Sequence, residues 1–392
     1  MRIADRLQRI SASPTMAVML EAQRLRSQGV DVIDLGPGQP DFPTPEPIKR
    51  AGIDAIVGDF TRYTASSGID ELRAALANSF NRRWGTRFEV ENVVVCAGAK
   101  QAVFSLCMAA FQEGDEVVIP APYWVTFPEV VKLAGATPVF LPTLEEHRFI
   151  PDIDALRECL TDRTRGLILN TPNNPTGAVI PGPILERLVA LTRDKGLFLI
   201  SDETYEQFTY DGREHVSVAD FIDADTTGFA VVGSFSKTHA MTGWRVGYCL
   251  GHAALMTKIG EFQSHQSGNP CSISQRAALA ALAGGEEDVE AMRREYERRR
   301  VAVLNRLESL DGFDCVPPEG TFYVFPNVRE AMSRVGCASS VDFCRFLLRE
   351  ARVATVPGSA FGAENYLRLS YAAPLDRLEA AFDRLEEALS HR

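Results

Sequence analysis

From about residue 90 to residue 251, the sequence alternates short apolar, β-branched runs with stretches that have the period of a helix. The expected strands are 93–96, 116–120, 138–141, 166–170, 197–202, 229–234 and 246–251. Helical stretches lie between them, for example at 100–110, 127–134 and 183–195. Runs that are apolar on both faces and joined by helices predict an α/β fold, in which helices cover both faces of a mostly parallel central sheet. In such sheets, ligands bind at the carboxyl ends of the strands.

Near residue 275 the pattern of helical and strand segments changes, and the new pattern predicts a smaller α+β domain. Its expected elements are a long charged helix over 275–310, a strand at 321–326, a helix at 340–351, strands near 353–356 and 366–371, and a last helix from Pro374. Two turn-rich segments, 35–47 and 63–73, are expected to be extended loops, and the prolines of the first disfavour a helix. The pattern does not fix which unit the segment before residue 40 joins. We assign 1–45 to the small domain as an N-terminal segment, 46–285 to a large domain and 286–392 to the small domain.

The composition excludes several classes of partner. Lys and Arg number 41 and Asp and Glu 52, a formal charge of −11 that disfavours nucleic acid and anionic lipid. No apolar run approaches the roughly 20 residues that span a bilayer, and the first ten residues do not resemble a signal peptide. The eight cysteines form no C-x-x-C pair and the six histidines no metal motif. We therefore expect a cytoplasmic protein with reduced thiols, no metal, no nucleic acid and no membrane contact.

The segment 233–248, GSFSKTHAMTGWRVGY, carries the strongest chemical signal. A strand ends at Ser234, a Ser-x-Ser-Lys turn brings Ser236 and Lys237, and Arg245 follows eight residues after the lysine. Hydroxyls, free backbone N–H groups and a guanidinium in one turn form a phosphate pocket. A lysine beside such a pocket is placed to form a Schiff base with a carbonyl cofactor. By itself, a lysine after a strand is more often a solvated surface residue.

Three further strand ends point to the same edge of the sheet. One strand runs into TPNNPTG, which holds Asn174 in a tight turn, and another runs into Asp202 with Tyr205 three residues later. A carboxylate after an apolar run is poorly hydrated and needs a cationic partner, and a pyridinium nitrogen would serve. The alternative for Asp202 is a helix N-cap. A third strand runs into AGAKQA, where Gly98 and Ala99 open a helix whose N–H groups could bind phosphate.

Together these segments resemble the fold-type-I aminotransferases, pyridoxal-phosphate enzymes of the aspartate aminotransferase superfamily. The resemblance covers about residues 8 to 388, and within the class G-A-K-Q at 98–101 and S-P-T-M-A-V at 13–18 are most similar to the gamma branch of bacterial aspartate aminotransferases. The remaining matching motifs are N-N-P-T-G at 173–177, S-D-E-x-Y at 201–205, S-x-S-K at 234–237, G-W-R-x-G at 243–247, P-Y-W at 122–124, G-x-P-D-F at 38–42 and R-L-S-Y-A at 368–372.

The resemblance implies a role for each catalytic position. Lys237 would be the Schiff-base lysine and the general base, and Asp202 would keep the ring nitrogen of pyridoxal 5′-phosphate protonated. Tyr205 and Asn174 would bond the phenolic oxygen of the ring. Trp124 would stack on the ring face, unless it is only a core aromatic residue.

The resemblance also implies the groups around the phosphate and the substrate. The phosphate would be surrounded by Gly98, Ala99, Lys100, Ser234, Ser236 and Arg245. Tyr63 would reach the phosphate of a neighbouring subunit, which implies a homodimer with shared sites. Arg368 would bind the substrate α-carboxylate bidentately, close to the N–H of Gly38, and Lys100, Trp124 and Asn174 would complete the substrate set. Lys100 would take a distal carboxylate, or would only neutralise the phosphate.

The expected function is ping-pong transamination between an amino acid, expected to be aspartate, and 2-oxoglutarate. The alternatives are a transaminase for aromatic or neutral amino acids or prephenate, a lyase or synthase on the same scaffold, or a protein without catalysis, which the intact residue set disfavours. Gln39 departs from the Glu usual in the branch. Ser11 stands where prephenate-using members resemble one another in a Lys, which disfavours prephenate. No G-x-G-x-x-G follows a strand, which disfavours a dehydrogenase.

Overall fold

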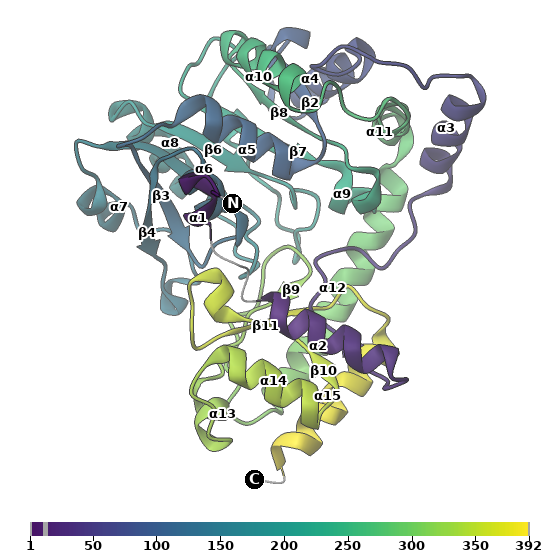
Figure 1. The fold of residues 1–392 in the computed structure, drawn as a ribbon, viewed down its shortest axis with the longest axis vertical. Helices are drawn as coiled ribbons and strands as arrows, with labels where there is room; N and C mark the ends of the chain where they lie inside the picture. Colours follow the sequence, from purple (N-terminus) through teal and green to yellow (C-terminus); the bar gives the residue numbers. More distant parts are fainter. Residues whose placement is uncertain (1, 11–14, 391–392) are drawn as a thin grey trace.

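A seven-stranded sheet forms the centre of the larger unit in the computed structural model, which describes residues 2–10 and 15–390 (Figure 1). The strand order is β2-β8-β7-β6-β5-β3-β4, and only β8 runs antiparallel to its neighbours. The strands are β2 (Val93–Cys96), β3 (Glu116–Ala121), β4 (Thr137–Pro142), β5 (Thr164–Asn170), β6 (Phe198–Asp202), β7 (Phe229–Ser234) and β8 (Gly247–Gly251). The mostly parallel sheet that the alternating sequence pattern predicted is confirmed.

Helices cover both faces of this sheet, and alternate residues of each strand explain why. Val93 and Val95 of β2 belong to one buried cluster, whereas Val94 and Cys96 belong to another. Successive side chains of a strand point to opposite faces, so a strand buried on both faces must be apolar at every position. The first cluster is covered by α4 (Asp70–Trp84), α7 (Ile153–Cys159), α8 (Gly182–Asp194) and α11 (Ser272–Gly284). The second is covered by α5 (Ala99–Ala110), α6 (Thr126–Leu133) and α10 (Ala253–Gln266).

The smaller unit is built around two short sheets and a separate apolar core. One sheet has the antiparallel order β11-β12-β9, and the other pairs β1 with β10 in parallel. Its strands are β1 (Ile33–Asp34), β9 (Tyr323–Val324), β10 (Val353–Ala354), β11 (Val356–Pro357) and β12 (Leu367–Ser370). Its helices are α2 (Thr15–Ser27), α12 (Glu286–Glu308), α13 (Arg329–Arg334), α14 (Ser340–Glu350) and α15 (Leu375–Ser390).

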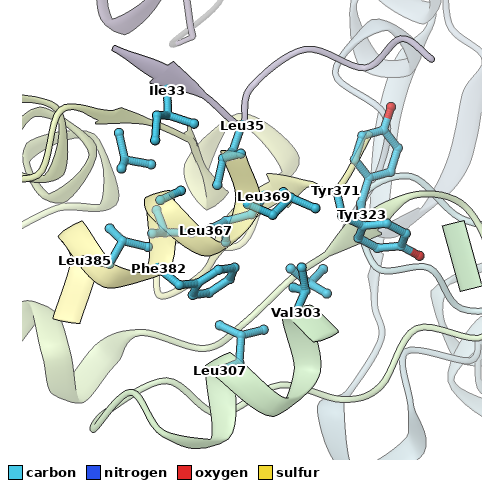
Figure 2. Packing of buried hydrophobic residues seen from close by; sticks show 14 of the residues in the cluster. Ile33, Leu35, Val303, Leu307, Tyr323, Leu367, Leu369, Tyr371, Phe382 and Leu385 are labelled. Carbon is cyan, nitrogen blue, oxygen red and sulfur yellow. The ribbon is translucent and has the colours of Figure 1, made fainter. Parts of the chain in front are cut away.

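The N-terminal segment contributes to both units. Figure 2 shows Ile33 and Leu35 beside Leu367 and Leu369 of β12, within the core of the small unit. By contrast, α1 (Asp5–Gln8) contacts α6 of the large unit. The segment therefore crosses from one unit to the other before residue 33.

Several element boundaries differ from the expectation. The single helix over 275–310 is wrong, because the Gly284–Gly285 pair separates α11 from α12. The loop 35–47 ends early, because α3 (Glu46–Val57) accepts Pro47 in its first turn, where a missing N–H costs nothing. The loop 63–73 likewise ends where α4 begins. The strand 321–326 shortens to β9. Short turns of helix complete the fold: α9 (Phe235–Thr238), η1 (Val90–Asn92), η2 (Glu145–His147), η3 (Val218–Phe221), η4 (Thr242–Trp244) and η5 (Gly358–Phe361).

Two structural features are absent from the described ranges, 2–10 and 15–390: a membrane-spanning helix and a metal-binding cluster. None of their helices combines the length and the apolar character that crossing a membrane requires. Nor do they contain a group of three or more His, Cys, Asp or Glu side chains that could hold a metal ion.

Candidate active site

A cavity of about 560 Å³ lies at the carboxyl ends of the central strands, where the two units meet. It is lined by nearly all of the site residues expected from the sequence: Gly38, Ala99, Lys100, Trp124, Asn174, Asp202, Tyr205, Ser234, Ser236, Lys237, Arg245 and Arg368. Gly98 lies directly behind this lining, against the guanidinium of Arg245. Tyr63 lies outside it, with 96% of its surface exposed.

Lys237 reaches the cavity from the turn that follows β7. The hydroxyl of Ser234 accepts a hydrogen bond from the N–H of Ser236 at 3.0 Å, which caps the short helix α9. The Lys237 ammonium donates to the carbonyl of Gly38. Burial, together with the positive charges of Arg368 and Arg245, lowers the pKa of Lys237 to about 8. The lowered pKa gives this amine a larger neutral fraction near neutral pH than an ordinary lysine has, which suits a nucleophile and a base.

Asp202 closes the same cavity from the end of β6 and is 4% exposed. Its carboxylate accepts hydrogen bonds from the Thr204 hydroxyl at 2.6 Å and the Thr204 N–H at 3.1 Å. Burial raises the pKa of Asp202 to about 6, against the opposing effect of those hydrogen bonds and of Lys237. Residues 204–207 form a turn rather than a helix, so the helix N-cap interpretation is wrong. The site offers a desolvated carboxylate that a cationic ligand group would stabilise.

A positively charged cradle lies at the N-terminus of α5. Gly98 has a φ of +84°, and a Cβ atom there would lie 2.6 Å from Nη2 of Arg245. The same Nη2 donates to the carbonyl of Ala97 at 3.2 Å, and Nη1 donates to that of Thr242 at 2.9 Å. Gly98 therefore allows the guanidinium to approach the helix terminus. Free backbone N–H groups, the positive end of the helix dipole and a fixed guanidinium together suit a phosphate.

Lys100 and Trp124 line the neighbouring wall. The Lys100 ammonium nitrogen lies 5.2 Å from the centroid of the Trp124 ring, within the range of a cation–π contact. Burial, and then the charge of Arg245, lower the pKa of Lys100. An ammonium in this position gains from an anionic ligand, which compensates both effects.

Arg368 faces these groups from β12 in the small unit. Its Nη1 donates to Oδ1 of Asn174 at 2.9 Å, and its Nη2 donates to the carbonyl of Gly36 at 2.7 Å. Its Nε is buried and has no partner within the described residues. Asn174 is itself fixed, because its N–H donates to Oδ1 of Asn170 at 2.8 Å. A guanidinium with an unused buried donor is ready to bind a planar carboxylate.

Sequence reasoning missed several residues that shape the cavity. Tyr323 lies with its hydroxyl 2.8 Å from that of Tyr205, and Thr204, Asn170 and Gly36 hold the groups described above. The run 321–326 signalled only a buried strand. Thr204 and Asn170 lie beside Asp202 and Asn174, so proximity to a motif is the signal that could have identified them.

Comparisons with known proteins agree with this geometry. The profile of the family described as aminotransferase class I and II matches residues 30–385. An aspartate aminotransferase of Geobacillus stearothermophilus is 42% identical over the full length of both chains. An aspartate/prephenate aminotransferase of Nitrosomonas europaea is 40% identical, also over both full lengths. The crystallised aspartate aminotransferase of Thermus thermophilus with maleate has a TM-score of 0.93 at 39% identity, covering 99% of this chain and 100% of that one.

The cavity fits pyridoxal 5′-phosphate, the cofactor of these enzymes, on its own donor set. It places a lysine of lowered pKa, a desolvated carboxylate and a cationic phosphate cradle around one space. Each of these groups complements a different part of the cofactor: the carbonyl, the ring nitrogen and the phosphate. By sequence, by fold and by the chemistry of this cavity, the chain belongs to the class I and II aminotransferases and is a pyridoxal-phosphate-dependent aminotransferase.

Proposed function

We propose that this enzyme transfers the amino group of aspartate to 2-oxoglutarate in a ping-pong cycle. The observation that carries the proposal is the presence of two separate cationic groups, Arg368 and Lys100, in the lining of one cavity. A dicarboxylate must lose water from two charges on entering, and each charge then needs a fixed partner. The printed names of the Geobacillus and Thermus relatives also support aspartate.

In this proposal, each residue of the site has a separate role. Lys237 Nζ would bind the cofactor at its carbonyl carbon, with loss of the carbonyl oxygen as water, and as a free amine it would move the proton at the substrate Cα. Asp202 stabilises the protonated ring nitrogen, Tyr205 and Asn174 bond the phenolic oxygen, and Trp124 covers the ring face. The cofactor supplies the electron sink. The cradle of Gly98, Ala99, Ser234, Ser236 and Arg245 holds the phosphate, with Lys100 beside it.

The substrate would be held at both ends. Arg368 offers its guanidinium, including the unpartnered Nε, to the α-carboxylate, with the N–H of Gly38 alongside. Lys100 takes the distal carboxylate, as the lowered pKa of its ammonium and its place over Trp124 suggest. The chain carries −11 overall, so attraction of a dicarboxylate depends on these local charges.

Substitution of Lys100 tests the acidic specificity. Lys100→Ala should raise KM for aspartate and 2-oxoglutarate and lower kcat/KM by roughly 10- to 100-fold, as expected for a charge-assisted contact. Alanine and phenylalanine as donors should be much less affected. Lys258→Ala, an exposed lysine paired with Glu261, is the matched control and should change neither. Equal losses for acidic and neutral donors, or loss of cofactor, would contradict a role for Lys100 at the distal carboxylate.

The second candidate substrate is prephenate, which the name of the Nitrosomonas relative favours, and an aromatic donor is a further alternative. Position 11, where prephenate-using members share a Lys and this chain has Ser, lies outside the described residues. A donor screen with 2-oxoglutarate, following glutamate formation, separates aspartate, aromatic donors and the lyase or synthase alternatives. Glutamate formed most efficiently from an aromatic donor would replace the primary assignment.

We also propose a homodimer in which Tyr63 completes the partner's phosphate site. Exposed apolar side chains gather on α3, where Ile53, Ile56 and Val57 are 47%, 53% and 77% exposed, and Tyr63 follows in the next loop. In Figure 1, α3 lies at the outer edge of the large unit. An apolar face of this kind fits a subunit interface.

Complementation tests the shared site. Lys237→Ala protein mixed with a Tyr63→Ala protein should gain activity, because one site of each hybrid dimer then has Lys237 and Arg368 of one subunit and Tyr63 of the other intact. No recovery after proven subunit exchange would contradict sharing. The proposed location is the cytoplasm, which the eight free thiols support. Formation of disulfides in the protein isolated from its cell would contradict that location.

A further inference from the structure

Tyr323 lies where three parts of the site meet, and the proposed function gives it no role. It is fully buried on β9, with its hydroxyl 2.8 Å from the hydroxyl of Tyr205. The guanidinium carbon of Arg368 lies 4.3 Å from the centroid of its ring. Because β9 and β12 are antiparallel neighbours, one small sheet presents both the carboxylate clamp and this tyrosine. Tyr205 follows β6 of the large unit, so the hydroxyl pair joins the two units inside the cavity.

The backbone of Gly38 is packed against the same hydroxyl. A Cβ atom at Gly38 would lie 2.4 Å from the oxygen of Tyr323, so only glycine fits there without displacing the tyrosine. The carbonyl of Gly38 also accepts the hydrogen bond from Lys237. Tyr323 therefore contacts three groups of the site: Arg368, Tyr205 and Gly38, whose carbonyl accepts the hydrogen bond from Lys237.

We infer that Tyr323 is a positioning residue that couples the Arg368 clamp to Tyr205, an inference that rests on the proposed function. Its hydroxyl donates to the Tyr205 oxygen, which leaves the Tyr205 proton for the phenolic oxygen of the cofactor. A hydroxyl that accepts a hydrogen bond becomes a stronger donor. The charge of Arg368, close to the Tyr323 ring, favours Tyr323 as the donor of the pair.

Burial keeps both phenols neutral and able to donate. It raises the pKa of Tyr205 well above its ordinary value and raises that of Tyr323, an effect that Arg368 opposes in both residues. When Arg368 binds a carboxylate, the positive charge beside Tyr323 is partly neutralised. This changes the strength of the hydrogen bond that Tyr323 donates to Tyr205. The inferred coupling is thus a direct chain of contacts from the clamp to the cofactor ring.

Two tyrosine-to-phenylalanine variants test this inference with the cofactor bound. Tyr323→Phe keeps the ring under Arg368 and removes only the hydroxyl. Tyr371→Phe is the matched control, because Tyr371 is buried in the same core and its hydroxyl donates to the Thr321 carbonyl at 3.1 Å. Figure 2 shows the two hydroxyls pointing away from each other. The readout is the pH midpoint at which the lysine-bound cofactor changes its visible absorption.

Tyr323→Phe should raise this midpoint by roughly 0.1 to 0.6 pH unit, which corresponds to a loss of about 10–30% of one charge-assisted hydrogen bond. The direction is upward, because a weaker Tyr205 donor leaves the phenolic oxygen more basic and favours the protonated nitrogen beside it. Saturation with maleate should shift the midpoint of wild type and Tyr371→Phe equally, and that of Tyr323→Phe less. A midpoint unchanged by Tyr323→Phe, or changed equally by both variants, would overturn the inference.

A second variant tests the ring itself. Tyr323→Leu should weaken maleate binding by roughly 3- to 30-fold through loss of the cation–π contact with Arg368, and Tyr371→Leu should not. Equal weakening in both variants would overturn the coupling through the ring. Absence of the absorption transition from the wild-type protein would overturn the proposed function and this inference together. A normal wild-type transition that Tyr323→Phe leaves in place would overturn this inference alone.

Discussion

Replacement of Asp202 by Asn is expected to make the cofactor-free protein more stable while it damages the enzyme. The ionised carboxylate is desolvated at 4% exposure, and its pKa rises from 3.8 to about 6. At about 1.4 kcal/mol per pKa unit, the difference corresponds to about 3 kcal/mol by which the charged form destabilises the folded state. The pKa of Asp202 is higher in the folded state than in the unfolded state. The contribution of Asp202 to stability is therefore fully present below the unfolded pKa of 3.8 and is lost as the pH rises through about 6.

The pH dependence gives the sharper test, since any constant effect of the amide cancels. From pH 5 to pH 7, the advantage of Asp202→Asn over wild type should widen by about 1.3 kcal/mol. Urea unfolding of both cofactor-free proteins at the two pH values measures it. Asp152→Asn is the control, because helix-capping hydrogen bonds lower the pKa of Asp152 from 3.8, so this carboxylate is ionised in both the folded and the unfolded state and its effect should stay constant from pH 5 to pH 7. A constant or shrinking advantage of Asp202→Asn would refute the desolvation argument.

With the cofactor bound, the effect on turnover should have the opposite sign. Asn preserves the shape and the acceptor for Thr204 but removes the charge that stabilises the protonated ring nitrogen. A loss of about 3–5 kcal/mol, the scale of a lost buried charge partner, lowers kcat/KM by roughly 100- to 5,000-fold. Steady-state kinetics measure it, and near-normal turnover would contradict the proposed role of Asp202.

Three further predictions concern the lysine, the clamp and a buried pair. Borohydride should fix the cofactor to the peptide that holds Lys237, and Lys237→Ala should bind cofactor yet lose turnover by several orders of magnitude; label on another lysine would contradict this. Arg368→Lys cannot replace both contacts at 2.9 and 2.7 Å, so kcat/KM should fall roughly 10- to 100-fold, chiefly through KM; an unchanged KM would contradict it. His215→Ala leaves Oε2 of the Glu203 carboxylate, 3.0 Å from His215 Nε2 and 2% exposed, without its hydrogen-bond partner, and thermal unfolding should show a loss of about 1–3 kcal/mol. A melting temperature within a degree of wild type would contradict that loss.

The sequence was sufficient to predict the central sheet and the strand ends that carry the site. Strands buried on both faces are apolar at every position, and polar residues such as Asp202 and Lys237 follow where they end. The boundary errors have local causes: the Gly284–Gly285 pair and a proline at a helix start. Such features change the termini of helices without changing the hydrophobic pattern.

Contacts between distant segments could not be predicted in the same way. Tyr323 stands in a run that is apolar for core reasons, and its contact with Tyr205 exists only because the small unit packs against the large one. The bond between Arg368 and Asn174 has the same origin. In the proposed homodimer, the environment of Tyr63 would depend on a second chain, which no periodicity within one chain encodes.

The antiparallel course of β8 has a consequence for the order in which the site is assembled during synthesis. Lys237 and Arg245 lie in the connection between two adjacent strands, β7 and β8, and Ser234 is paired with Gly247. The phosphate cradle is therefore complete within residues 93–251, although Ala97 and Arg245 are 148 residues apart, whereas the clamp arrives only with residue 368. Domains emerge from the ribosome in chain order. A nascent chain should thus form the phosphate cradle before Arg368 is available to bind a substrate carboxylate.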